Sequence, residues 1–237
     1  MGERVIDRDK SVIVAADVEF SRLPELVQQT CLVEGISGYK VGLELALERG
    51  LPDVVGVVKD NSDLHVMYDH QKAGNDIPET GGRFAKVCKN AGVDSVILFP
   101  FAGSKTERDW IRACQDAGLG VLVGAHMTQP EFLYSEGGSI ADNAPERIFT
   151  IAAENGVRDF VVPGNKIEYV AKYKELLDQQ LGEGNFTLYA PGFITQGGEI
   201  SDFAKAAGNK WHAIVGSAIY KATNINEAAK QMTRTII

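Results

Sequence analysis

The chain has 237 residues, of which 24 are basic and 32 acidic, and its formal net charge is -8 at neutral pH. This acidic balance argues against nucleic-acid binding as the main function, although a local basic pocket could still hold an anionic ligand. The three cysteines are widely spaced and form no CxxC or Cys/His pattern, so neither a disulfide framework nor a zinc site is indicated. The N-terminus is charged where a signal peptide is apolar, and no apolar run approaches the roughly 18 residues of a membrane span. We therefore expect a cytoplasmic protein that does not enter a membrane.

Short apolar runs with the composition of buried strands recur along the chain. They are Val12–Ala16, Ile36–Val41, Leu64–Tyr68, Ser95–Phe99, Gly120–Ala125, Phe160–Val162, Thr187–Ala190 and Ala213–Val215. Helical spacing of apolar residues is found between them, over Leu23–Val33, Arg83–Ala91, Thr106–Ala117, Pro145–Asn155, Ile167–Leu181 and Ile200–Ala207. Eight strands that alternate with helices are typical of a closed parallel barrel.

No proline-rich linker or low-complexity tract divides the chain, so we predict one α/β domain over residues 1–237, a (β/α)8 TIM barrel with its active site at the C-terminal face of the strands. A doubly wound open sheet is the main alternative. The Gly-x-Gly-x-x-Gly turn that many nucleotide-binding versions carry after the first strand is absent, because residues 15–19 are AADVE.

Charged residues are concentrated directly after the third predicted strand. Asp69 and Lys72 would lie at the C-terminal mouth of the barrel, where carboxylates and an ammonium fix one another's charge. Such an array suits chemistry at a developing carbanion, since the ammonium stabilises negative charge and can donate a proton. Taken alone, the cluster would more commonly be a solvated structural ion pair.

The other strand ends add groups to the same face. Asp17 follows the first strand, Lys40 lies in the second, and Thr128 follows the fifth. Glycine-rich segments follow the seventh strand, at residues 192–198, and the eighth strand, at Gly216. Glycines let backbone amides approach a ligand, and a helix that begins at Gly216 favours a phosphate. We therefore expect a phosphorylated substrate.

In combination, these motifs resemble orotidine 5'-monophosphate decarboxylase over nearly the whole chain, in order from the first strand to the last. The motifs are Asp17, Lys40-Val41-Gly42, Asp69 with Lys72 and Asp76-Ile77-Pro78-x-Thr80, Pro191-Gly192 with Gln196-Gly197-Gly198, and Ile214-Val215-Gly216-x-Ala218-Ile219-Tyr220. The resemblance implies a homodimeric (β/α)8 barrel that converts orotidine 5'-monophosphate to uridine 5'-monophosphate in pyrimidine nucleotide biosynthesis. It also implies that neither a metal nor an organic cofactor takes part.

The resemblance assigns the catalytic roles to four residues. Lys40, Asp69, Lys72 and Asp76 would form a tetrad of alternating charge. Lys72 would protonate C6 of the pyrimidine, and Asp69 would crowd the departing carboxylate while holding Lys72 in place.

Substrate-binding roles follow from the same resemblance. Asp17 and Lys40 would bind the ribose hydroxyls, and Thr128 stands where the family usually has a serine that touches the pyrimidine. The neighbouring subunit would contribute Asp76, Ile77 and Thr80. The phosphate would be bound by Gln196 and Gly197 from a closing loop and by Gly216 and Ser217 after the last strand.

The spacing of the charged residues departs from the family pattern. The family has Asp-x-Lys-x-x-Asp, whereas each gap is one residue longer in this chain. Either a bulge or turn restores the geometry, or His70 occupies the place assigned to Asp69. We favour Asp69, because a neutral histidine could not supply the negative field that keeps Lys72 protonated.

A second departure concerns the phosphate. Ser217 stands where the family usually has an arginine, and the lost charge-assisted pair would be worth about 1.5 to 3 kcal/mol. Another cation could substitute, and Lys166, Lys210 and Lys221 are the candidates.

Some conspicuous residues have structural explanations. His65 on an apolar strand, and His126 nearer the mouth, are both expected to be packed structural histidines. The segment Gln129 to Asn143 is predicted to be either a lid over the mouth or a disordered surface loop.

Two other functions remain open. The keto-gulonate-phosphate decarboxylase and hexulose-phosphate synthase group uses a similar charged element with Mg²⁺, but that function would need further carboxylates that converge on the metal. Ile77-Pro78 and Gln196-Gly197-Gly198 argue against it. A non-catalytic nucleotide-binding paralogue is suggested by the lengthened spacing and by Ser217.

Overall fold

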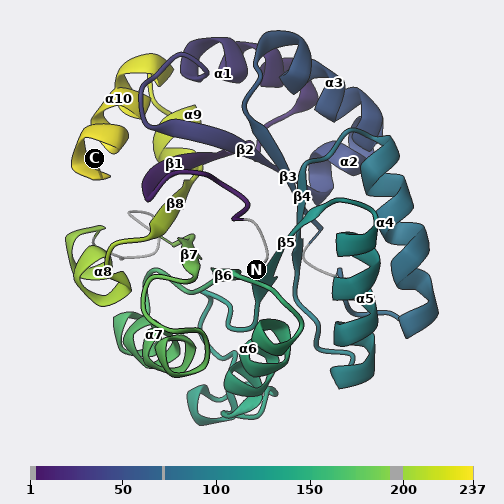
Figure 1. The fold of residues 1–237 in the computed structure, drawn as a ribbon. Coiled ribbons are helices and arrows are strands. Elements are labelled where there is room, and N and C mark those ends of the chain that lie inside the picture. The colour runs from purple at the N-terminus through teal and green to yellow at the C-terminus, as the bar shows by residue number, and fades with distance from the viewer. Residues whose placement is uncertain (1–3, 71–72, 193–199, 237) are drawn as a thin grey trace.

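The computed structural model describes residues 4–70, 73–192 and 200–236. These residues form eight parallel strands that close in sequence order into a barrel (Figure 1). The strands are β1 (Lys10–Ala15), β2 (Ile36–Gly42), β3 (His65–Asp69), β4 (Ser95–Leu98), β5 (Gly120–Gly124), β6 (Asp159–Val161), β7 (Thr187–Ala190) and β8 (Trp211–Val215). Each strand overlaps its predicted run, so the predicted (β/α)8 barrel is confirmed.

Helices surround the barrel in Figure 1. Six of them match predicted segments, namely α1 (Leu23–Thr30), α4 (Gly81–Asn90), α5 (Ser104–Asp116), α6 (Ala144–Glu154), α7 (Ile167–Leu181) and α8 (Ile200–Ala207). Further helices are α2 (Leu43–Arg49), α3 (Leu51–Asn61), α9 (Ser217–Tyr220) and α10 (Ile225–Ile236). Within the described ranges, no helix combines the length and apolar character needed to cross a membrane.

The connection between β2 and β3 contains two helices because Gly50 interrupts it. Gly50 has a φ of 82°, in the left-handed region that favours glycine, and it ends α2. Pro52 then stands in the first turn of α3, where its missing N–H removes no helical hydrogen bond. This break makes the helical pattern of residues 43–61 hard to detect in the sequence.

Side chains of the strands alternate between two apolar layers. On β1, Val12 and Val14 pack outward against the helices, whereas Ile13 and Ala15 point into the barrel. Both faces of the strand are therefore buried, which explains why the strands are continuous apolar runs in the sequence. The interior layer consists of Ile6, Ile13, Ala15, Met67, Ile97, Phe99, Leu122, Val161, Tyr189 and Ile214.

Buried polar side chains near the N-terminal ends of the strands hydrogen-bond in pairs. The Ser11 hydroxyl and Nδ1 of His212 are 2.7 Å apart, and the hydroxyl of Tyr189 donates to Asp159 at 2.9 Å. His65 bonds through Nε2 to the Ser95 hydroxyl at 2.8 Å, in agreement with its expected structural role. These pairs fill the base of the barrel.

Phe99 lies across the interior of the barrel at the end of β4. A Cβ atom on Gly124 of β5 would stand 2.2 Å from the Phe99 ring, so only glycine leaves space for this ring. The phenyl group thereby forms part of the floor beneath the C-terminal mouth.

Glu107 of α5 is a buried acid whose surroundings favour the neutral carboxyl over the carboxylate. The residue is 1% exposed, and its Oε1 has no hydrogen-bond partner among the described residues. Burial raises the pKa of its carboxyl to about 8, although Arg108 and Arg147 act in the opposite direction. The carboxyl is therefore largely protonated in the folded protein at neutral pH.

Replacing this acid should change the pH dependence of stability. The unfolded chain loses the Glu107 proton above the ordinary pKa of 4.5 and the native protein only above about 8, so stability falls as pH rises through this interval. Glu107→Gln, which has no proton to lose, should gain a few kcal/mol relative to wild type between pH 5 and pH 8. Urea unfolding at the two pH values measures this difference.

The control is Glu154→Gln, at the exposed end of α6. It should keep the pH dependence of the wild type. An unchanged dependence in Glu107→Gln as well would contradict the buried, protonated carboxyl.

Candidate active site

A cavity of about 330 Å³ opens at the carboxyl ends of the strands. Its lining residues come from nearly every strand end around the mouth. They are Ala15, Asp17, Lys40, Asp69, Ile97, Phe99, His126, Met127, Thr128, Gln129, Val161, Pro191, Gly192, Ile214, Val215, Gly216, Ser217, Ala218 and Tyr220. The predicted location of the site, at the C-terminal face of the barrel, agrees with this cavity.

Lys40 lies between two carboxylates at the edge of the cavity. Its Nζ is 3.2 Å from Oδ1 of Asp17, which follows β1, and 3.3 Å from Oδ2 of Asp69, the last residue of β3. The arrangement follows from the sheet, because β2 carries Lys40 and pairs with both β1 and β3.

The two carboxylates hold Lys40 in its charged form. Burial alone would lower the pKa of the ammonium, but the negative charges of Asp69 and Asp17 outweigh it and raise the pKa. Asp69 is itself buried, at 4% exposure, whereas about half of the Asp17 side chain is exposed. Asp69 therefore acts through a less solvated environment, in which charge interactions are stronger.

Asp69 and His70 point in different directions, as expected for adjacent residues at a strand end. His70 hydrogen-bonds through Nδ1 to the hydroxyl of Tyr68, and its ring makes an edge contact with Phe84 of α4. The geometry thus favours Asp69 over His70 as the acid of the cavity. Lys72, the predicted proton donor, lies outside the described residues.

The turn before Asp76 is attached to the end of β4. Gly74 has a φ of 91° and packs against Pro100. The Asn75 side chain donates to the backbone oxygen of Phe99 at 2.7 Å and accepts from the N–H of Phe101 at 2.8 Å. These contacts fix Gly74 and Asn75 against the residues that follow β4.

The structure does not bring Asp76, Ile77 and Thr80 to this cavity. Their backbone is held by α5, since the Thr106 hydroxyl donates to the Asp76 carbonyl at 3.0 Å and the Trp110 indole donates to the Ile77 carbonyl at 3.1 Å. The side chains of Asp76 and Ile77 are exposed, with Ile77 at 57%. A large exposed apolar side chain beside an acid is compatible with a contact to another chain.

Glycines lie at the predicted phosphate end of the cavity. Gly192 has a φ of 101°, and Gly216 precedes the first residue of α9. A Cβ atom on Gly216 would stand 3.3 Å from the Ala15 side chain and from the Tyr220 ring, so the backbone here is closely packed. Ser217 also lines the cavity. Gln196 and Gly197 lie outside the described residues.

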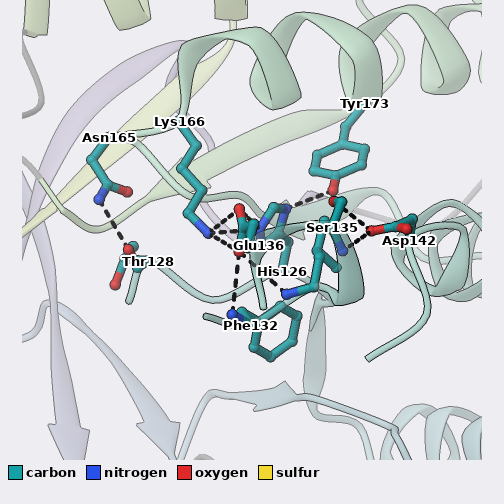
Figure 2. Close-up of polar contacts among 10 residues, drawn as sticks. His126, Thr128, Phe132, Ser135, Glu136, Asp142, Asn165, Lys166 and Tyr173 are labelled. Carbon is teal, nitrogen blue, oxygen red and sulfur yellow. Dashed lines mark hydrogen bonds and ion pairs between the residues drawn. The ribbon is translucent and has the colours of Figure 1, made fainter. Parts of the chain in front are cut away.

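None of the three candidate cations lines the cavity. Lys166 forms an ion pair with Glu136, with Nζ 2.7 Å from Oε1 (Figure 2). Lys210 precedes β8 at the opposite end of the barrel and donates to the Gly184 carbonyl at 2.6 Å, and Lys221 is exposed after α9. Among the described residues that line the cavity, Lys40 is the only lysine or arginine.

The segment Gln129 to Asn143 is ordered, so the expectation of a disordered loop is wrong. It contains a short 3-10 helix, Tyr134–Glu136, and Tyr134 and Ile140 are joined by a backbone hydrogen bond of 2.7 Å. Leu133 is fully buried beneath it. Hydrogen bonds within this segment, and from it to the neighbouring turn, hold its fold. The amino-acid composition of the segment does not reveal these bonds, so the sequence alone did not predict its order.

Comparison with known proteins identifies the family. Residues 10–232 match the sequence model of the Orotidine 5'-phosphate decarboxylase / HUMPS family. The chain belongs to this family. Among its relatives, the orotidine 5'-phosphate decarboxylase of Methanosarcina barkeri is 31% identical over 235 residues, which cover 98% of this chain and 91% of that protein.

Solved structures of the family share the fold. The crystal structure of orotidine 5'-phosphate decarboxylase from Pyrococcus horikoshii is 28% identical, covers 94% of this chain and 97% of its own, and has a TM-score of 0.76. Orotidine 5'-monophosphate decarboxylase from Methanocaldococcus jannaschii, complexed with the inhibitor BMP, superposes with a TM-score of 0.82 at 24% identity. The superposed region covers 96% of this chain and 98% of the Methanocaldococcus jannaschii chain.

Several lining residues of this family member were given no role by the sequence. Ile97, Phe99 and Val161 form an apolar wall, and Tyr220 lies beside the charged edge. Alternation along the strands could have identified Ile97 and Phe99, because inward positions near the C-terminal end of a barrel strand face the mouth. Tyr220 ends the motif that follows the last strand, but the resemblance assigned it no role.

Proposed function

We propose that this protein decarboxylates orotidine 5'-monophosphate to uridine 5'-monophosphate in pyrimidine nucleotide biosynthesis. Membership of the family and the names of its relatives support the reaction. The observation that carries the proposal in this chain is the largely buried Lys40 ammonium between Asp17 and Asp69, at the edge of a cavity that also has an apolar wall and a glycine-rich end. Each part of the cavity suits one part of the nucleotide.

The nucleotide would lie across the mouth of the barrel. Asp17 and Lys40 would hydrogen-bond the ribose hydroxyls. The pyrimidine ring would lie against the apolar wall, and Thr128, which lines the same cavity, would offer its hydroxyl to the polar edge of the ring. The phosphate would meet the backbone N–H groups of Gly216, which precedes α9, and of Ser217, its first residue. Gln196 and Gly197 would reach it from the preceding loop.

Lys72 would be the proton donor. When the bond between C6 and the carboxylate breaks, CO2 leaves and the electron pair stays on C6, where no adjacent π-system accepts it. An ammonium held within reach stabilises this charge and then transfers its proton to C6. Asp69 would oppose the substrate carboxylate in the ground state and keep Lys72 charged, and no metal or organic cofactor enters the reaction.

Asp76 would act in the active site of a second subunit. Its turn leaves the mouth and presents Asp76 and Ile77 to the exterior, so these side chains are available to a neighbouring chain. We propose a homodimer in which Asp76, Ile77 and Thr80 complete the partner's site. The cytoplasmic location expected from the sequence stays a prediction.

The magnesium-dependent reaction of the same superfamily is less well supported. A cation that binds between Asp17 and Asp69 would compete with the Lys40 ammonium, which contacts both carboxylates. Among the described residues, no group of three or more His, Cys, Asp or Glu side chains converges as a metal site would require. A non-catalytic nucleotide-binding protein would bind uridylate without converting orotidylate.

An assay of uridylate formation from orotidylate tests the reaction. We expect turnover that is unaffected by a chelator, and Lys72→Ala should reduce kcat by several orders of magnitude while uridylate binding persists, because this change removes the proton donor. The matched control is Lys230→Ala, at an exposed position of α10, which should behave as wild type. Turnover that requires Mg²⁺, or an active Lys72→Ala variant, would contradict the proposal.

Mixing two inactive variants tests the shared site. In a hybrid of Lys72→Ala and Asp76→Ala, one active site receives both lesions and the other receives neither. Random subunit exchange should therefore restore about a quarter of all sites. The measurement is decarboxylase activity after exchange, with hybrid dimers identified by mass spectrometry. If both residues served the same chain, every site would keep one lesion and activity would remain at the level of the parents.

A further inference from the structure

The segment between β5 and α6 is folded around the carboxylate of Glu136. Its Oε2 accepts the backbone N–H groups of Phe132 and Leu133, each at 3.2 Å. The backbone of Ile140 also bonds to Phe132, at 3.2 Å. Asp142 adds a second contact, since its Oδ1 accepts from the backbone N–H of Ser135 at 3.0 Å and from the Ser135 hydroxyl at 2.6 Å (Figure 2). Glu136 thus helps to fix the conformation of the segment and also presents its charge to the rest of the protein.

Lys166 binds this carboxylate from the turn between β6 and α7. Its Nζ lies 2.7 Å from Oε1 and 2.8 Å from Oε2 of Glu136. Both side chains are largely buried, at 14% and 21% exposure, so the ion pair is better shielded than one at the surface. This ion pair is one of two contacts by which the turn between β6 and α7 holds the region from β5 to α6.

His126 lies directly beneath the ion pair. It is 1% exposed, with Nε2 2.9 Å from Lys166 Nζ and Nδ1 2.7 Å from the Tyr173 hydroxyl. Burial, together with the Lys166 charge, lowers the pKa of His126 to about 4, so its ring is neutral at neutral pH. An ammonium can only donate, which makes Nε2 the acceptor and leaves the ring proton on Nδ1, from which it is donated to Tyr173.

Asn165, the residue before Lys166, supplies the second point of attachment. Its amide nitrogen donates to the backbone oxygen of Thr128 at 3.0 Å (Figure 2). His126, Met127, Thr128 and Gln129 all line the cavity. Two consecutive residues of one turn therefore hold both the cavity wall and the segment that follows it.

We propose that Asn165 and Lys166 are positioning residues that hold residues 126–129 in place against the pyrimidine of the bound nucleotide, with Glu136 as the anchor on the segment. This proposal rests on the proposed function, because it takes Thr128 to face the base. Asn165, Lys166 and Glu136 together form what we call the clamp. The clamp touches neither the charged edge at Asp17 and Lys40 nor the glycines at the phosphate end. Its loss should therefore weaken recognition of the base while recognition of ribose phosphate remains.

Binding of uridylate and of ribose 5-phosphate, measured by calorimetry, separates these two effects. Lys166→Met keeps the apolar stem and removes the charge, and Asn165→Ala removes the amide donor. Each variant should bind uridylate roughly tenfold or more weakly than wild type, because a displaced wall loses its contact with the base. Each should bind ribose 5-phosphate within about twofold of wild type. Lys166→Arg should restore most of the uridylate affinity.

Lys172→Met is the matched control. Lys172 of α7 pairs with Glu146 of α6, so it is another lysine–glutamate pair nearby, but it lies at the surface and contacts neither Thr128 nor Glu136. This variant should bind both ligands as wild type does. The charge of Lys172 acts on Asp142 of the segment without a direct ion pair. Amide hydrogen exchange over residues 129–143 should therefore become much faster in Lys166→Met than in Lys172→Met.

The proposal would be overturned if Lys166→Met bound uridylate as tightly as wild type. Equal losses for uridylate and ribose 5-phosphate would also overturn it, since they would indicate a general structural effect rather than a displaced base wall. Failure of the proposed function has a different signature. Wild-type protein would then fail to convert orotidylate to uridylate, whether or not it binds uridylate, while the difference in hydrogen exchange between the two lysine variants would still report the clamp.

Discussion

Lys40 carries a positive charge in the mouth of the barrel. A largely buried charge without partners there would strongly destabilise the folded protein. Asp17 and Asp69 meet this requirement, and they can do so only because β1, β2 and β3 pair in register. The closed barrel supplies this register. The apolar interior below the mouth keeps water from the charges on that side, so the fold both imposes the cost of burial and places the groups that offset it.

The walls of the cavity depend on residues that do not line it. Asn165 and Lys166 hold the wall that contains Thr128, and Trp110 holds the turn that carries Asp76. Such supporting contacts fix the geometry of a site to a fraction of an ångström, which charge and shape alone do not achieve. Specificity for a pyrimidine nucleotide would accordingly be distributed over two layers of residues.

The sequence predicts the strands well because both faces of each strand are buried, which leaves continuous apolar runs. It also predicts Asp17, Lys40 and Asp69, since polar residues at the end of such runs can only lie at the mouth. Helices α2 and α3 are missed because Gly50 and Pro52 interrupt their pattern. The order of residues 129–143 is missed for a different reason. It depends on hydrogen bonds within the segment, which its composition does not show, and on the pairing of Glu136 with Lys166, which are far apart in the sequence and carry no local signal of their pairing.

The most direct test of the central claim, that this mouth is a nucleotide site organised around Lys40, is a crystal structure with uridylate bound. We expect the ribose hydroxyls on Asp17 and Lys40, the base between Thr128 and the apolar wall, and the phosphate at Gly216 and Ser217. A nucleotide bound elsewhere, or bound with its phosphate on Lys40 and its base at the glycines, would contradict this assignment.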